Sequence, residues 1–132
     1  MAIAEYNNLT IIRQTKGRIP ILPFVEIKNA ILGTSYELSL VFPTLQRAEA
    51  LHIEWKKKPD PVNILSFPLD DDVGEIIITL QQARREARQY GRSYHNHLIF
   101  LFIHGCLHLK GMTHGVKMEQ RERLLYKRFA QS

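Results

Sequence analysis

The sequence predicts an α+β domain, close to the α/β class, in which a small mixed sheet of four strands is packed by about five helices. Three observations predict this class. Some short segments are β-branched or alternate polar and apolar residues, as strands with one wet face do. Others carry apolar residues at every third or fourth position, the spacing of an amphipathic helix. The two kinds of segment are interspersed, which favours one sheet with helices on its faces.

Four segments have the pattern of strands. Residues 9–14 are β-branched and apolar, and residues 36–42 alternate with a period of two. Residues 63–69 and 75–80 are apolar runs separated by Asp70-Asp71-Asp72-Val73-Gly74. Acidic residues and a glycine between two apolar runs predict a hairpin.

Helical spacing and end signals predict five helices, over residues 20–33, 44–55, 80–91, 93–109 and 118–130. Gly33 ends the first, while Thr44 and Ser93 are suitable N-caps for the second and fourth. The fourth is apolar on nearly every side from Leu98 to Cys106, so we expect it to be the central, buried helix.

Length and composition predict one globular domain, residues 1–132, since domains most often have ~100–150 residues. The single cysteine excludes an intramolecular disulfide, which fits a reducing cytosol. No apolar run approaches the ~18 residues of a membrane span, and the N-terminus does not resemble a signal peptide. We therefore expect a cytoplasmic protein without a membrane partner. The net charge of +5 permits a polyanionic partner such as nucleic acid.

Three of the six histidines, His104, His108 and His114, lie in the segment HGCLHLKGMTH. Positions 104 and 108 are one helical turn plus ~40° apart, so both imidazoles leave the same helix face. Gly111 can adopt the left-handed conformation that ends a helix and brings His114 back as a third ligand. The spacing H-x3-H-x2-G-x2-H coincides with the zinc frame of metzincin proteases. The alternative is an unmetallated polar cap around a turn.

Three neutral imidazoles with an open fourth position form a catalytic zinc arrangement, in which the ion lowers the pKa of a water towards ~7. Cys106 lies ~200° around the helix from His104, so we expect it to point into the core. His95 and His97 begin the same helix and are expected at the surface.

The residue after the first histidine is Gly105, where a metzincin carries its glutamate base. Glycine cannot take a proton, which disfavours a protease. Metal-assisted hydrolysis without that base suits a phosphodiester better than an amide, because a metal ion stabilises the charge that develops on a phosphate.

Two stretches together resemble the YbeY endoribonuclease family. Residues 104–114 are similar to its hallmark H-G-x-L-H-L-x-G-Y-D-H, and residues 63–68 with 74–78 (NILSFP and GEIII) to N-V-L-S-F-P and G-[DE]-I-x-I. The resemblance implies a single-strand-preferring endoribonuclease with one zinc ion on His104, His108 and His114. It also implies maturation of ribosomal RNA precursors at the small-subunit 3′ end, ribosome quality control, and contact with the small subunit or its proteins.

The resemblance also implies further site residues. An arginine that precedes N-V-L-S-F-P in the family, and that contacts the RNA phosphate, corresponds here to Lys56. Lys57 and Lys58 adjoin it and can share this contact; the alternative for all three is a solvated basic helix end. Ser66 is expected either in the metal cleft, against substrate, or at a tight packing point.

Two departures from the family pattern weaken the catalytic interpretation. Lys56 lacks the bidentate fork of arginine, and Met112-Thr113 replaces Tyr-Asp, so a threonine stands where the family has a charge. The second hypothesis is therefore a ribosome- or RNA-binding module with a mainly structural zinc and weak or lost nuclease activity. Finally, Arg84, Arg85, Arg88 and Arg92 fall on one predicted helical stripe, which is either a solvated face or an RNA track.

Overall fold

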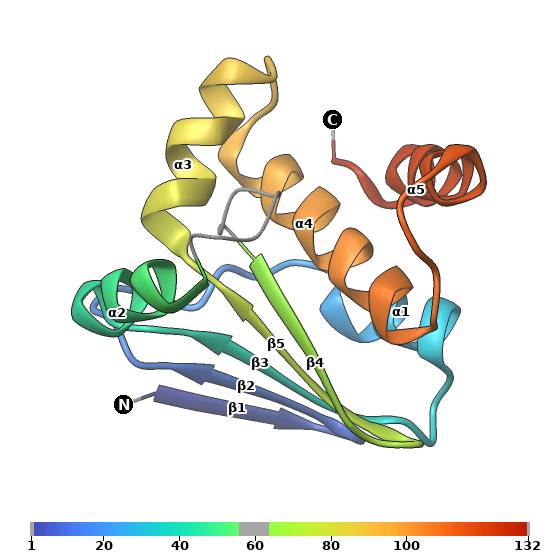
Figure 1. Cartoon of the computed structure of the whole chain (residues 1–132), viewed down its shortest axis with the longest axis horizontal. Coiled ribbons are helices and arrows are strands. Elements are labelled where there is room, and N and C mark those ends of the chain that lie inside the picture. Colours follow the sequence, from blue (N-terminus) through green and yellow to red (C-terminus); the bar gives the residue numbers. More distant parts are fainter. Residues whose placement is uncertain (1, 56–63, 132) are drawn as a thin grey trace.

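The computed structural model describes residues 2–55 and 64–131. Within this part, five strands form one mixed sheet in the order β1-β2-β3-β5-β4 (Figure 1). The strands are β1 (Ala2–Tyr6), β2 (Leu9–Arg13), β3 (Glu37–Phe42), β4 (Ile64–Asp70) and β5 (Val73–Ile78). The three central strands are parallel, and the two edge strands pair antiparallel to their neighbours. This confirms the α+β class, the mixed sheet and the β4–β5 hairpin.

The sheet has one more strand than the four predicted. Strand β1 pairs with β2 through a two-residue turn at Asn7 and Asn8. Asn8 has a φ of 59°, a left-handed conformation that asparagine tolerates better than most residues. The Asn-Asn pair before residues 9–14 was the available signal for this hairpin.

The helices are α1 (Phe24–Leu32), α2 (Leu45–Trp55), α3 (Leu80–Gln89), α4 (Tyr94–Leu109) and α5 (Val116–Phe129). Both predicted N-caps are confirmed: the Thr44 and Ser93 hydroxyls accept the backbone N–H groups of Arg47 and Asn96 at 3.1 Å. The first helix is shorter than predicted and begins only after Pro23, because prolines fit a helix start but not its interior. No helix in the described part of the chain is both long and apolar enough to cross a membrane.

Helix α4 is the central element, as predicted. It packs against α1, α3 and α5 and against strands β4 and β5 (Figure 1). Phe102 in its middle is fully buried and meets Phe24 of α1 edge to face, with ring centroids 5.0 Å apart. Such pairs add stability beyond their buried area. A helix fixed on so many sides holds its side chains in defined positions.

The crossing of α4 over the sheet requires a glycine. A Cβ on Gly105 would lie 2.8 Å from Ile64 Cδ1 and 3.0 Å from Ile76 Cδ1. The Ser66 hydroxyl donates to the Gly105 carbonyl at 3.3 Å, so helix and edge strand are joined at this point. Position 105 therefore faces the sheet, and packing demands the absence of a side chain there.

The end of α4 is a Schellman turn. The N–H of Met112 donates to the Leu107 carbonyl and that of Gly111 to the His108 carbonyl, both at 3.0 Å. Gly111 has a φ of 105°, which L-residues rarely adopt. The predicted glycine-dependent reversal is confirmed, and it directs the chain back along α4 towards His114.

Candidate metal centre

The structure brings the three predicted histidines together. His104 and His108 project from α4, and His114 follows the turn that ends this helix. Each histidine offers a ring nitrogen such that the three atoms lie within 4.8 Å of one another. The first two rings are partly buried and His114 is exposed. The cluster therefore has one side in the protein and one side open to solvent.

A carboxylate from another helix holds His104. Its Nδ1 lies 3.2 Å from Oε2 of Glu122, which is 7% exposed on α5. A carboxylate accepts hydrogen bonds, so Nδ1 carries the proton and the lone pair of Nε2 faces the cluster. A carboxylate behind an imidazole is the usual outer partner of a metal-bound histidine, since it fixes the tautomer and raises the basicity of the ring.

The helix turn holds His108 in the same way. Its Nδ1 donates to the Met112 carbonyl at 3.1 Å, and a carbonyl oxygen can only accept. The residue that closes the Schellman turn thus also sets the tautomer of a candidate ligand. The Nε2 lone pair of His108 faces the cluster as well.

These tautomers test whether the site fits a metal. The Nε2 atoms of His104 and His108 are 3.0 Å apart, and with both Nδ1 atoms protonated neither Nε2 carries a hydrogen to share. Two lone pairs at this distance repel unless a cation lies beside them. Two nitrogen ligands at ~2.0–2.1 Å from a tetrahedral zinc ion are ~3.3 Å apart. The donor set therefore fits a divalent metal ion that prefers imidazole nitrogen.

Cys106 and Ser66 stand outside the histidine cluster. Cys106 is fully buried in the core, as predicted, and burial raises the pKa of its thiol far above the ordinary value. It is a small apolar residue in this fold, not a fourth ligand. The Ser66 hydroxyl bonds the α4 backbone at Gly105, and its contact with substrate stays a prediction.

The expectation that His97 lies at the surface is wrong. Its side chain is 1% exposed, and its Nε2 lies 3.0 Å from Oε1 of buried Glu86 on α3. His97 falls on the same helix stripe as Phe100 and His104, which turns it inward, and Glu86 satisfies its polar edge. His95 is exposed, as expected.

The predicted basic stripe is only partly present. Helix α3 ends at Gln89, so Arg92 does not continue its surface. Its guanidinium instead lies over the Phe100 ring, 4.1 Å from the centroid. Arg84, Arg85 and Arg88 are exposed on α3. Lys56, Lys57 and Lys58 lie outside the described residues.

Glu122 was not among the residues predicted for the site, although its position along α5 carries a signal. Along α5 the buried positions Met118, Glu122 and Leu125 form one stripe, in which only the middle one is charged. A charge within the apolar face of a helix needs a partner. His104 is that partner.

The fold and the histidines define a class of protein: a mixed α+β domain with three clustered histidines, which could hold a metal ion, at the end of its central helix. The family model of endoribonuclease YbeY matches residues 14–129. The chain therefore belongs to the YbeY family.

Several relatives agree with this family. Endoribonuclease YbeY from Bartonella bacilliformis is 32% identical over 108 residues, covering 71% of this chain and 68% of that protein. The one from Renibacterium salmoninarum is 29% identical over 131 residues, covering 89% and 83%. The one from Carboxydothermus hydrogenoformans is 38% identical over 78 residues, and the chain spans only about half of it, 54%.

A solved structure supports the fold. The solution structure of TM1509 from Thermotoga maritima aligns with a TM-score of 0.62, covering 89% of this chain and 87% of that one. Sequence identity is 22%, so this likeness concerns the fold alone.

We predict that Glu122→Gln weakens metal binding ~10–100-fold, because the amide keeps the shape but loses the charge behind His104. Competition against a chromophoric chelator measures this affinity. Glu119→Gln, one turn earlier on α5 and exposed, is the matched control and should bind as the unchanged chain does. Equal affinities in the two variants would contradict the role of Glu122.

The metal-free chain should lose stability in acid. Burial lowers the pKa of His108 below its ordinary value of 6.5, and the neighbouring His104 and His114 lower it further. Between the lowered pKa of His108 in the folded chain and its ordinary value of 6.5, the unfolded chain binds more protons than the folded chain. The free energy of unfolding therefore falls as the pH drops below 6.5. Urea unfolding of chelator-treated protein across that pH measures the slope. His108→Gln should flatten this slope of stability against pH. An unchanged slope in this variant would refute the role of His108 in the acid sensitivity.

Proposed function

We propose that this chain is a zinc-dependent endoribonuclease that cleaves single-stranded RNA. The observation that carries the proposal is the cluster of three imidazoles, two with fixed tautomers, in a member of the YbeY family. The relatives that match are named Endoribonuclease YbeY, which supports the same activity here. The open side of the cluster, at exposed His114, leaves access for a strand of RNA.

His104, His108 and His114 would hold the metal ion through ring nitrogens. Zinc suits them because neutral imidazole is among its preferred ligands. When bound, the ion acts as a Lewis acid towards a phosphoryl oxygen and lowers the pKa of water. Glu122 and the Met112 carbonyl keep the two helix imidazoles in the ligating tautomer.

Lys56 is our candidate for the group that holds the phosphate near the metal, with Lys57 and Lys58 sharing the contact and Ser66 lying towards the substrate. Lysine attracts a phosphate as a point charge and orients it less strictly than arginine. The charge absent at Thr113 is offset by Glu122, since one carboxylate already stands behind a candidate ligand. This contact favours retained metal binding and catalysis.

We further propose that residues 1–132 act as one cytoplasmic domain in ribosome biogenesis. Its substrates would be ribosomal RNA precursors, notably at the small-subunit 3′ end, and its partners the small subunit or its proteins. The family membership and the basic surplus of +5 support an RNA substrate. We propose that the chain also acts in ribosome quality control.

The competing hypothesis is an RNA-binding module with a mainly structural metal. Lys56 and Thr113, where the family carries arginine and aspartate, favour it. The two hypotheses differ in whether RNA is cut.

Protein purified without chelators should contain about one metal ion per chain, in which zinc predominates, and should cleave single-stranded RNA. His108→Ala should abolish cleavage and reduce metal content, because two nitrogen ligands do not replace three. Elemental analysis and gel analysis of a labelled RNA measure both quantities. The matched control is His95→Ala, an exposed histidine on the same helix. A metal-loaded chain that binds RNA without cutting it would support the binding module.

Lys56→Ala should lower RNA cleavage or affinity more than Lys110→Ala does. Both changes remove one positive charge, and only position 56 corresponds to the phosphate-binding position of the family. Single-turnover cleavage over a range of protein concentrations separates binding from the rate of the cut. Equal effects of the two substitutions would argue against a role for Lys56.

A further inference from the structure

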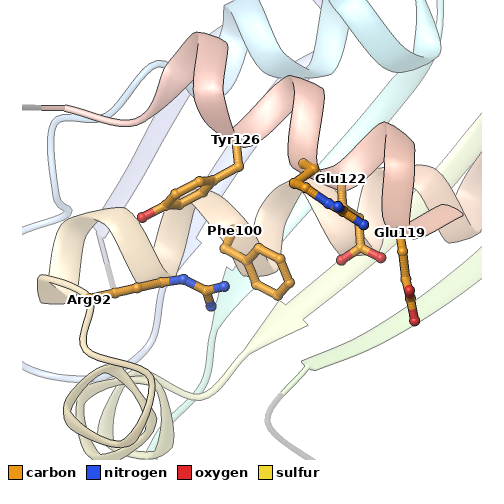
Figure 2. Close-up of a pocket in the computed structure, with 6 residues that line it drawn as sticks. Arg92, Phe100, Glu119, Glu122 and Tyr126 are labelled. Atoms are coloured by element: carbon orange, nitrogen blue, oxygen red, sulfur yellow. The ribbon is translucent and has the colours of Figure 1, made fainter.

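A hollow of about 250 Å³ opens beside the metal centre, between the start of α4 and α5 (Figure 2). It is lined by Arg92, Phe100, Glu119, Glu122, Arg123 and Tyr126. Two of these residues contact His104: Glu122 hydrogen-bonds its ring, and Phe100 stacks on it with centroids 6.3 Å apart. A group in this hollow is therefore adjacent to a candidate metal ligand.

Buried side chains of α3 and α4 hold the Arg92 guanidinium in the hollow. Buried Glu86 accepts from Nε2 of His97, which leaves Nδ1 of that ring to accept from Nη1 of Arg92 at 3.2 Å. Two side chains from the interior thus orient this guanidinium. The contact uses one of its five N–H donors.

The hollow presents flat groups. The Arg92 guanidinium lies 4.1 Å from the Phe100 centroid and 5.2 Å from that of Tyr126. The two rings meet edge to face at 6.1 Å, so their planes form a corner. Unpaired nucleic-acid bases stack on aromatic rings and on arginine planes of this kind.

The charges around these flat groups suit a nucleotide. Arg123 is exposed on α5 at the rim and can meet a phosphate, while Glu119 offers oxygen acceptors for the N–H groups of a base. Two arginines beside the carboxylates disfavour a second metal ion. The volume is below the ~300–1,000 Å³ of drug-sized ligand pockets, which favours a single base.

We propose that this hollow receives one unpaired base of the RNA strand, near the phosphate at the metal centre. The base stacks against Tyr126 and the Arg92 plane, and Arg123 contacts the adjoining phosphate. Glu86 and His97 are positioning residues that act through Arg92. This inference rests on the proposed function for its substrate, and its test does not require cleavage.

The test compares two single strands of equal length, oligoadenosine and an abasic ribose-phosphate oligomer. Binding is measured by fluorescence anisotropy with chelator-treated protein. Tyr126→Leu, which keeps apolar bulk without a flat ring, should lower affinity for oligoadenosine about fivefold or more, the effect of losing one base stack. Affinity for the abasic strand should not change. Tyr126→Phe keeps the ring and should bind oligoadenosine as the unchanged chain does.

Arginine variants test the other contacts. Arg123→Ala should weaken binding of both strands, whereas Arg121→Ala, on the same helix ~200° away, should weaken neither. If Tyr126→Leu does not fold by circular dichroism, Arg92→Lys decides, because it keeps the charge but lacks the plane: it should lose affinity for oligoadenosine alone.

The outcomes separate this inference from the proposed function. If the chain cleaves RNA, but Tyr126→Leu lowers the affinity for both strands equally or for neither, the base site is overturned and the nuclease proposal stands. A loss confined to oligoadenosine in a chain that cuts no RNA supports the base site and refutes the nuclease.

Discussion

The close packing of α4 on the sheet is the constraint on which the rest of this structure depends. At Gly105 the helix comes so near β4 and β5 that a methyl group would meet Ile64 and Ile76. This contact fixes the rotation of α4 about its axis, since only the position of Gly105, which has no side chain, fits against the strands. Once that rotation is set, Cys106 points into the core, His104 reaches Glu122 on α5, and His108 reaches the Met112 carbonyl on the returning chain.

The candidate metal centre is assembled from groups that serve the fold at the same time. Met112 closes the Schellman turn with its N–H and holds His108 with its carbonyl. Glu122 is a buried residue of α5. An unpaired carboxylate there would destabilise the fold, and the hydrogen bond from His104 satisfies it. The Nε2 atoms of His104 and His108 lie 3.0 Å apart with both Nδ1 atoms already hydrogen-bonded, an arrangement that suits a shared cation.

A continuous row of rings links the interior to this centre. His97 stacks between Tyr90 and Phe100, and Phe100 stacks in turn on His104. Arg92 lies over the same row and is held by His97. The start of α4 therefore shapes the hollow beside the metal centre, while its end carries two of the candidate ligands. One helix thus connects the proposed cutting site with the proposed base site.

The sequence by itself determined the features that depend on short stretches of chain. Strand and helix periods, the caps at Thr44 and Ser93 and the histidine frame all rest on neighbours within a few residues, and local geometry sets their arrangement. The tertiary structure alone decided the partners that come from other elements: Glu122 behind His104 and Glu86 behind His97. Such contacts follow from how helices and strands pack, and packing satisfies buried charges wherever the fold brings them together.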